Sequence, residues 1–167
     1  MRNAFAIRLR QRVAAIQGLE VILCGELARC SNELLEREAA RLGRVSELEA
    51  EISLDTLASQ IASALGCVPR VWGDPQTRVR TVAVATGSGG SLIGDARAAG
   101  AQVLVAGEVR YHDALDAMGS GLCIVEAGHD MTEWPLVEFL GTALRAMLTL
   151  PEDRIIIDTP HARWWTP

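Results

Sequence analysis

The chain has 167 residues, of which 49% are apolar and 22% are charged, a composition that suits one soluble domain with a packed core. Its net charge is −5, no basic run is long enough to follow a phosphate backbone, and no apolar run is long enough to span a bilayer, so neither nucleic acid nor a membrane is an expected partner. The chain lacks lysine, which excludes Schiff-base and P-loop lysine chemistry, and its four cysteines form no CxxC pair, which predicts reduced thiols and a cytoplasmic location.

The first part of the chain is predicted to be helical. Residues 4–40 have a helical pattern that ends before Gly43. The run 53–56, which reads Ser-Leu-Asp-Thr, begins a second helix because its serine suits an N-cap. This second helix continues to about Leu65 and ends at Gly66.

Strands and helices alternate in the second part of the chain. Short apolar or β-branched runs predict strands at 81–86, 103–106, 122–126 and 155–158. The intervening segments predict helices at 92–99, 111–118 and 132–150. Continuous apolar strands that alternate with helices are typical of a mostly parallel sheet covered on both faces. The sequence therefore predicts an α/β domain over 42–167, with a central mixed or mostly parallel sheet flanked by helices and a helical N-terminal segment over 1–41.

Three polar loops follow the predicted strands, at 87–91, 107–112 and 128–133. They carry the most polar side chains of the second part of the chain. Ligands of such sheets bind at the carboxyl ends of the strands. We therefore expect the functional site where these loops meet.

The loop 128–133 contains a candidate pair of metal ligands, His129 and Glu133. They are four residues apart, which places both side chains on one face of the first turn of a helix. Imidazole and carboxylate groups suit zinc, manganese, iron or nickel, and a carboxylate can bridge two ions. The structural alternative is a capping histidine beside a glutamate that the helix dipole stabilises, and spacing alone favours it because such pairs are common.

The loop 107–112 contains a second pair with the same spacing, Glu108 and His112. These residues are candidates for orienting a metal ligand or holding a catalytic water, and His112 is a candidate general acid–base. In the structural alternative, Glu108 caps a helix and His112 is a partly buried histidine. Spacing alone favours that alternative.

The loop 87–91 is rich in glycine and lies between a strand and a helix, where exposed N–H groups can hold a phosphate or another anion. Its first two glycines begin a dinucleotide fingerprint, and Glu108 lies where a ribose-binding acid would be, but Leu92 takes the place of the third glycine. The alternative is a tight turn whose small residues let a helix pack on the sheet. The candidate anion-binding residues are Gly87, Ser88, Gly89 and Gly90.

Taken together, these segments resemble the Nif-three-like family, whose members are also called GTP cyclohydrolase type-two homologues. The resemblance covers roughly residues 42–150 and rests on VAVATGSGGSLI (82–93), AGEVRYHDALDA (106–117) and EAGHDMTE (126–133), in that order. It implies a two-part α/β protein, commonly a hexameric homo-oligomer, that holds two divalent transition-metal ions and hydrolyses a nucleotide or a similar small molecule. In this resemblance His129 and Glu133 match metal ligands, and Glu108 and His112 match positions near the site.

The N-terminal segment departs from the family's pattern. The resemblance implies that the N-terminal half supplies a His-His pair and an aspartate, whereas residues 1–41 contain no histidine. One copy of the chain therefore does not supply the full dinuclear site by this pattern. The chain is a fragment, or its other half is another chain, or its site is degenerate.

Three functions remain open at this point. The first is a metal-dependent hydrolase, incomplete in this chain, which predicts bound transition metal. The second is a Rossmann-type nucleotide-binding module that uses 87–91 and Glu108, which predicts dinucleotide binding without metal. The third is a non-catalytic assembly protein, which predicts association of chains without metal or activity.

Overall fold

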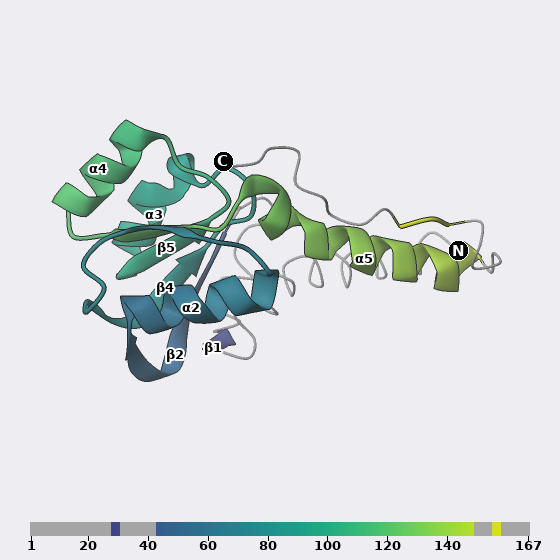
Figure 1. Cartoon of the computed structure of the whole chain (residues 1–167), viewed down its shortest axis with the longest axis horizontal. Coiled ribbons are helices and arrows are strands. Elements are labelled where there is room, and N and C mark those ends of the chain that lie inside the picture. The colour runs from purple at the N-terminus through teal and green to yellow at the C-terminus, as the bar shows by residue number, and fades with distance from the viewer. Residues whose placement is uncertain (1–27, 31–42, 149–154, 158–167) are drawn as a thin grey trace.

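A mixed six-stranded sheet organises the chain in the computed structural model, which describes residues 28–30, 43–148 and 155–157 (Figure 1). The strand order is β1-β2-β4-β5-β6-β3. The strands are β1 (Ala28–Cys30), β2 (Arg44–Ser53), β3 (Arg70–Trp72), β4 (Arg78–Val84), β5 (Val103–Ala106) and β6 (Cys123–Glu126). β4, β5 and β6 are parallel neighbours, and the other three pairings are antiparallel. The predicted α/β fold with a mixed sheet is confirmed.

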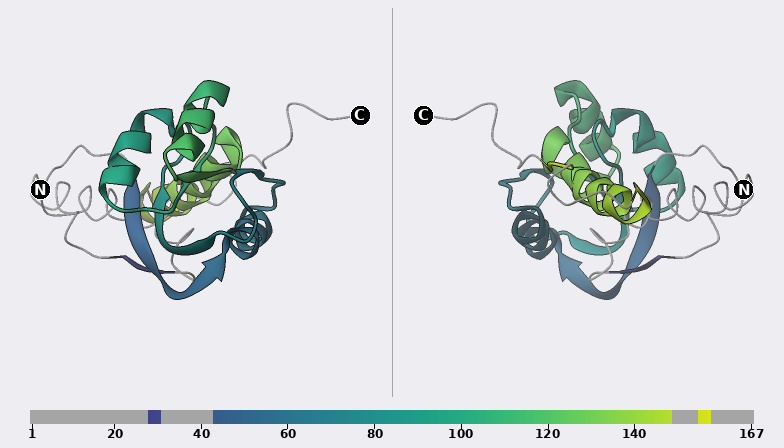
Figure 2. Two further views of the ribbon diagram at one scale, coloured as in Figure 1. Left: turned by 90° about the vertical axis from the view of Figure 1, so that its left-hand side faces the viewer. Right: turned by 90° about the vertical axis from the view of Figure 1, so that its right-hand side faces the viewer.

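Helices cover both faces of this sheet (Figure 2). α2 (Leu54–Leu65) covers one face, and α3 (Ile93–Ala98) and α4 (Tyr111–Gly119) cover the other. Another helix, α5 (His129–Leu148), follows β6. A 3-10 turn, Gly90–Leu92, precedes α3. No helix among the described residues combines the length and the apolar composition that a membrane crossing requires.

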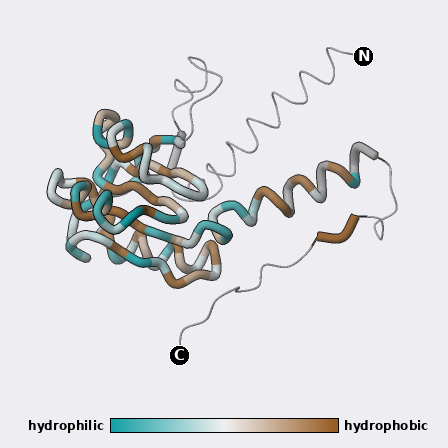
Figure 3. The backbone as a smooth tube through the Cα atoms, turned by 90° about the horizontal axis from the view of Figure 1, so that it is seen from above, coloured by the Kyte–Doolittle hydropathy of each residue, from teal (hydrophilic) through white to brown (hydrophobic). Residues whose placement is uncertain are grey.

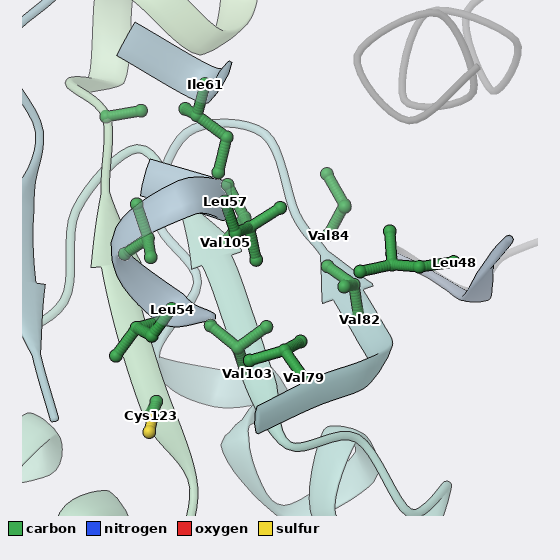
Figure 4. Packing of buried hydrophobic residues seen from close by; sticks show 12 residues of the cluster. Leu48, Leu54, Leu57, Ile61, Val79, Val82, Val84, Val103, Val105 and Cys123 are labelled. Carbon is green, nitrogen blue, oxygen red and sulfur yellow. The ribbon is translucent and has the colours of Figure 1, made fainter. Parts of the chain in front are cut away.

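Two apolar layers form because side chains alternate along the central strands. Val82, Val103 and Val105 face α2, whose Leu54 and Leu57 pack against them (Figure 4). The other face carries smaller side chains, and the buried alanines of α3 and α4 pack there against β4, β5 and β6. The small side chains let these two short helices lie close to the sheet, and this sets the position of the loops at its carboxyl edge.

The helix α2 begins and ends where the sequence predicts. The Ser53 hydroxyl accepts a hydrogen bond from the Thr56 N–H at 3.1 Å and so caps the first turn. Gly66 has a φ of 64°, a left-handed conformation that ends the helix at little steric cost. Burial raises the pKa of the Cys67 and Cys123 thiols, so these two side chains stay protonated at neutral pH.

Two element predictions are wrong where the structure describes them. Residues 155–157 form no strand, because the Ile155 carbonyl accepts a hydrogen bond from Arg145 Nη2 of α5 at 2.7 Å and the Ile157 side chain lies against Gly141. This apolar run therefore packs on a helix. Residues 28–30 form β1, paired with β2, and are not helical. The rest of the predicted helical segment over 4–40, and the last residue of the predicted strand, lie outside the described residues.

The helix α5 extends away from the sheet (Figures 1 and 3). Its N-terminal turn lies at the carboxyl edge of the strands and carries His129 and Glu133. Farther along, Val137, Leu140 and Leu144 are exposed. The base of this helix is thus part of the loop cluster, whereas its outer turns stand apart from the sheet.

Candidate functional site

The loops after β4, β5 and β6 meet at the carboxyl edge of the sheet and are hydrogen-bonded to one another. The Glu108 N–H donates to the Gly87 carbonyl at 3.0 Å, and the Gly89 N–H donates to the Glu108 carbonyl at 3.0 Å. The Gly128 N–H donates to the Gly107 carbonyl at 2.9 Å. These bonds continue the parallel pairing of the strands into the loops, so they hold the three polar segments in fixed positions.

The imidazole of His129 lies between two carboxylates. Its Nδ1 is 3.1 Å from Glu108 Oε1, and its Nε2 is 3.4 Å from Glu133 Oε1. A carboxylate on Nδ1 holds a proton there and leaves the Nε2 lone pair free to bind a cation, as in metal-binding histidines. The same contacts also fit an imidazolium between two carboxylates. All three side chains are about half exposed, so solvent and small ligands reach them.

The backbone of Gly87 lies close to these two donor atoms. A β-carbon at this position would lie 2.6 Å from Glu133 Oε1 and 3.1 Å from His129 Nε2, and the φ of 63° also favours glycine. A side chain here would therefore collide with the His129 and Glu133 pair. One imidazole nitrogen and one carboxylate oxygen lie together beside this glycine, and both are ligand types that suit a divalent transition metal.

Thr132 fastens the glycine loop to the first turn of α5. Its buried hydroxyl donates to the His129 carbonyl at 3.0 Å and accepts from the Gly87 N–H at 2.9 Å. Sequence reasoning missed this residue. The available signal was a threonine in the first turn of a helix, where short hydroxyl side chains bind nearby backbone groups.

Two of the four amides in the candidate anion-binding loop are used within the protein. The Gly87 N–H donates to Thr132, and the Gly89 N–H donates to the Glu108 carbonyl. A β-carbon at Gly89 would lie 2.5 Å from the Ala106 β-carbon, so this glycine permits close packing of the loop on β5. The packing alternative therefore has direct support here, and anion binding by the loop stays a prediction.

Glu108 and His112 contact different residues. Glu108 contacts His129, as a residue that orients a ligand would. His112 is exposed on α4, and its ring packs edge-on against Tyr111 at a centroid distance of 5.4 Å. Within the described residues, no hydrogen bond or ion pair joins His112 to His129 or Glu133. Its general acid–base role stays a prediction.

The buried carboxylate of Glu126 is hydrogen-bonded to the loop 107–112. It is 7% exposed and accepts hydrogen bonds from the Val109 N–H at 2.9 Å and from Trp72 Nε1 at 2.8 Å. Arg70 Nε lies 3.2 Å from Oε2, the oxygen that also accepts the Trp72 N–H. Sequence reasoning placed Glu126 in a strand and gave it no role, although an acid at the end of an apolar strand was the signal. Glu126 thus links β3, β6 and the loop that carries Glu108.

The described residues supply only part of a metal centre. Nowhere in 43–148 or the two shorter described segments do three or more His, Cys, Asp or Glu side chains group as metal ligands do. His129 and Glu133 offer two donor atoms, whereas catalytic zinc sites use three protein ligands and structural ones use four. The residues present fit a metal ion, but as one side of a site.

The family model for Duf34/NIF3 (NGG1p interacting factor 3) matches residues 13–159. The chain belongs to this family. The GTP cyclohydrolase 1 type 2 homolog of Streptomyces coelicolor is 42% identical over 106 residues, which cover 61% of this chain and 37% of that protein. The homolog of Clostridium perfringens is 35% identical over 99 residues, which cover 59% of this chain and 38% of the relative. The predicted family resemblance is confirmed.

Solved structures of related proteins have the same fold. A Bacillus cereus protein related to NIF3 matches with a TM-score of 0.57 at 34% identity, over 64% of this chain and 30% of that one. A Staphylococcus aureus protein matches with a TM-score of 0.62 at 27% identity, over 75% of this chain and 36% of that one. The chain thus spans between 30% and 38% of the length of these four proteins.

Proposed function

We propose that this member of the Duf34/NIF3 family binds a divalent transition metal through His129 and Glu133, as part of a metal-dependent hydrolase site for a nucleotide or a similar small molecule. The observation that carries the proposal is the arrangement of His129 between Glu108 and Glu133, beside a glycine at position 87 where a side chain would collide with the pair. The names of the relatives, GTP cyclohydrolase 1 type 2 homologs, support the nucleotide part of the proposal. The metal is zinc, manganese, iron or nickel, which all accept imidazole and carboxylate ligands.

Each residue of the site has a distinct task in this proposal. Glu108 holds a proton on Nδ1 of His129, which directs the Nε2 lone pair toward the metal position. Glu133 adds a negative oxygen on the same side. When bound, the ion supplies Lewis-acid chemistry that activates water for hydrolysis. His112 is a candidate for proton transfer, and the glycine loop is a candidate for holding an anionic part of the substrate.

The donor set requires a second contribution. Because His129 and Glu133 supply two ligands where a catalytic site needs at least three, the others come from residues outside the described ranges or from another molecule. A homo-oligomer in which copies share the site satisfies this requirement. The proposal therefore includes association of chains, with a hexamer as the arrangement that the family resemblance implies.

The test is the metal content of purified, untagged protein, measured by elemental analysis after metal is added back and excess is removed. We expect about one or two ions per chain in the wild type and none in a His129→Ala/Glu133→Ala double variant, because both donor atoms are lost. An Asp95→Ala/Asp116→Ala double variant is the matched control, since it removes two exposed charges from α3 and α4. It should bind metal as the wild type does.

Glu108→Gln gives a graded version of the same test. We expect this variant to bind metal about 10- to 100-fold more weakly, because the amide orients His129 less well than the carboxylate does. A wild-type protein that stays empty at every metal tested would contradict the proposal. His129, Glu108 and Glu133 would then be an ion-paired network with a structural role.

A non-catalytic assembly function is the second candidate. It is favoured by the exposed apolar side chains of Val137, Leu140 and Leu144, which spacings of three and four residues place on one face of α5. This function predicts association of chains in the absence of metal. Measuring the association state with and without a chelator, by light scattering, separates it from a metal-dependent function.

A further inference from the structure

An exposed aromatic cluster lies at the same edge of the sheet as the metal-ligand pair. The rings of Trp72 and Tyr111 meet edge to face with centroids 5.5 Å apart, and His112 meets Tyr111 at 5.4 Å. Tyr111 is 59% exposed, whereas Trp72 is half buried. The described geometry of the metal site makes no use of this tyrosine, so a large ring is left open to ligands beside the site.

The cluster is held in place by a hydrogen bond to Glu126. The buried carboxylate of Glu126 accepts the Trp72 indole N–H at 2.8 Å and the Val109 N–H at 2.9 Å. Trp72 in turn packs against Tyr111, which begins α4 two residues after Val109. A ring fixed in this way loses little conformational freedom when a ligand stacks on it. The cluster is therefore preorganised for a flat partner.

The loop 107–112 connects the ring to the metal-ligand pair. Glu108, which contacts His129, and Tyr111 are three residues apart on this loop. Three residues span at most about 10 Å. The backbone between these two residues is therefore short enough for a ligand as long as a nucleotide triphosphate to bridge them.

The charges around the cluster suit an anion only in part. Arg70 and Arg110 are exposed beside the ring, and each contacts one carboxylate through Nε, so their guanidinium groups extend into solvent. Glu108, at the far end of the loop, and Glu133 of α5 are negative and repel a phosphate unless a cation lies between. A phosphate-bearing ligand therefore needs the metal ion at that end and the ring at the other.

From these contacts we propose that Tyr111 is a stacking platform for the base of a nucleotide whose phosphates reach the metal held by His129 and Glu133. This inference rests on the proposed function and assigns the ligand class of the same site. Nucleotides combine a flat π-system with phosphates that bind both divalent cations and guanidinium groups. Arg110 and Arg70 lie at the rim of the platform, where they pair with phosphate or cover the second face of the base.

The test measures the binding of three probes by calorimetry with Mn²⁺ present: GTP, guanosine and inorganic tripolyphosphate. Tyr111→Ala should weaken binding of GTP and guanosine by about 5- to 100-fold, and leave tripolyphosphate within about twofold. Tyr111→Phe keeps the ring and should bind all three as the wild type does. Leu115→Ala, a similarly exposed position on α4, is the matched control and should change nothing.

The His129→Ala/Glu133→Ala variant separates this inference from the metal proposal. It should lose GTP and tripolyphosphate binding and keep guanosine binding, because only the phosphate end depends on metal. A wild-type protein that holds no metal but binds guanosine through Tyr111 would support the platform and contradict the metal site. A wild-type protein that binds metal, together with a Tyr111→Ala variant whose nucleotide affinity is unchanged, would support the metal site and contradict the platform.

Two further results would overturn the platform. One is a wild-type protein that binds neither GTP nor guanosine at millimolar concentration. The other is a Tyr111→Ala variant with unchanged nucleotide affinity and an altered association state, which would make the ring a contact between proteins. Circular dichroism of each variant checks that the fold is kept, and Tyr111→Phe tests the hydroxyl separately from the ring.

Discussion

Replacing Gly107 with alanine is expected to lower the free energy of unfolding by about 1–3 kcal/mol and to displace the first turn of α5. A β-carbon at this position would lie 2.6 Å from the Gly87 carbonyl oxygen and 2.7 Å from the α-carbon of His129. Both are backbone atoms, so neither moves aside without shifting a loop or a helix. The Thr132 hydroxyl, 2.7 Å away, closes the third side.

The measurement is unfolding in urea, followed by circular dichroism, for Gly107→Ala and for a matched control. Gly94→Ala is that control, because its β-carbon meets no atom within 4 Å and alanine favours a helix. It should be neutral or stabilising by up to about 1 kcal/mol. If Gly107→Ala is as stable as Gly94→Ala, the three loops are not packed as described. Under the metal proposal, Gly107→Ala also weakens metal binding, since the first turn of α5 moves and His129 loses its contact with Glu108.

The central strands were predictable because their signal is local. β5 is apolar at every position and covers 103–106, as the sequence predicts, and β6 begins one residue after its predicted start. Such strands are buried on both faces, so each residue carries the same signal. The caps of α2 at Ser53 and Gly66 were predictable for a similar reason, since both depend on a few neighbouring residues.

β2 was not predicted because its charged residues obscure the alternation of buried and exposed side chains along the strand. Ser46 and Leu48 are buried, whereas Glu47, Glu49 and Glu51 are exposed. Glutamate disfavours strands by itself, and here its charge is balanced across the sheet by Arg78, whose Nε lies 2.7 Å from Glu51, and by Arg80. These partners are distant in the sequence, so the pairing that makes β2 favourable is not visible locally.

The candidate site shows the same limit. The spacing of His129 and Glu133 places them on one helical turn, and their contact at 3.4 Å agrees with it. The contact between Glu108 and His129 requires that two loops meet, which the topology indicates but the spacing does not. The roles of Thr132 and Glu126 depend on side-chain directions across three elements, and no periodic pattern in the sequence indicates these roles.

Replacing Glu126 with alanine is expected to lower the free energy of unfolding by about 2–4 kcal/mol. The change leaves the buried N–H groups of Trp72 and Val109 without acceptors, at roughly 1–3 kcal/mol each. It also removes the partner of Arg70, which contributes little because that side chain is mostly exposed. Glu126→Gln should lose less, since it keeps one acceptor oxygen but turns an NH₂ group toward a donor.

Glu51→Ala is the matched control, because it too removes a glutamate that pairs with an arginine, at 2.7 Å, but on the exposed face. This variant should cost at most about 1 kcal/mol. Urea unfolding compares the two. Equal losses would mean that Glu126 acts only as an ion-pair partner. A much larger loss at Glu126, together with a change in tryptophan fluorescence, would mean that one buried carboxylate determines both the stability of this edge of the sheet and the rigidity of the Trp72–Tyr111 cluster.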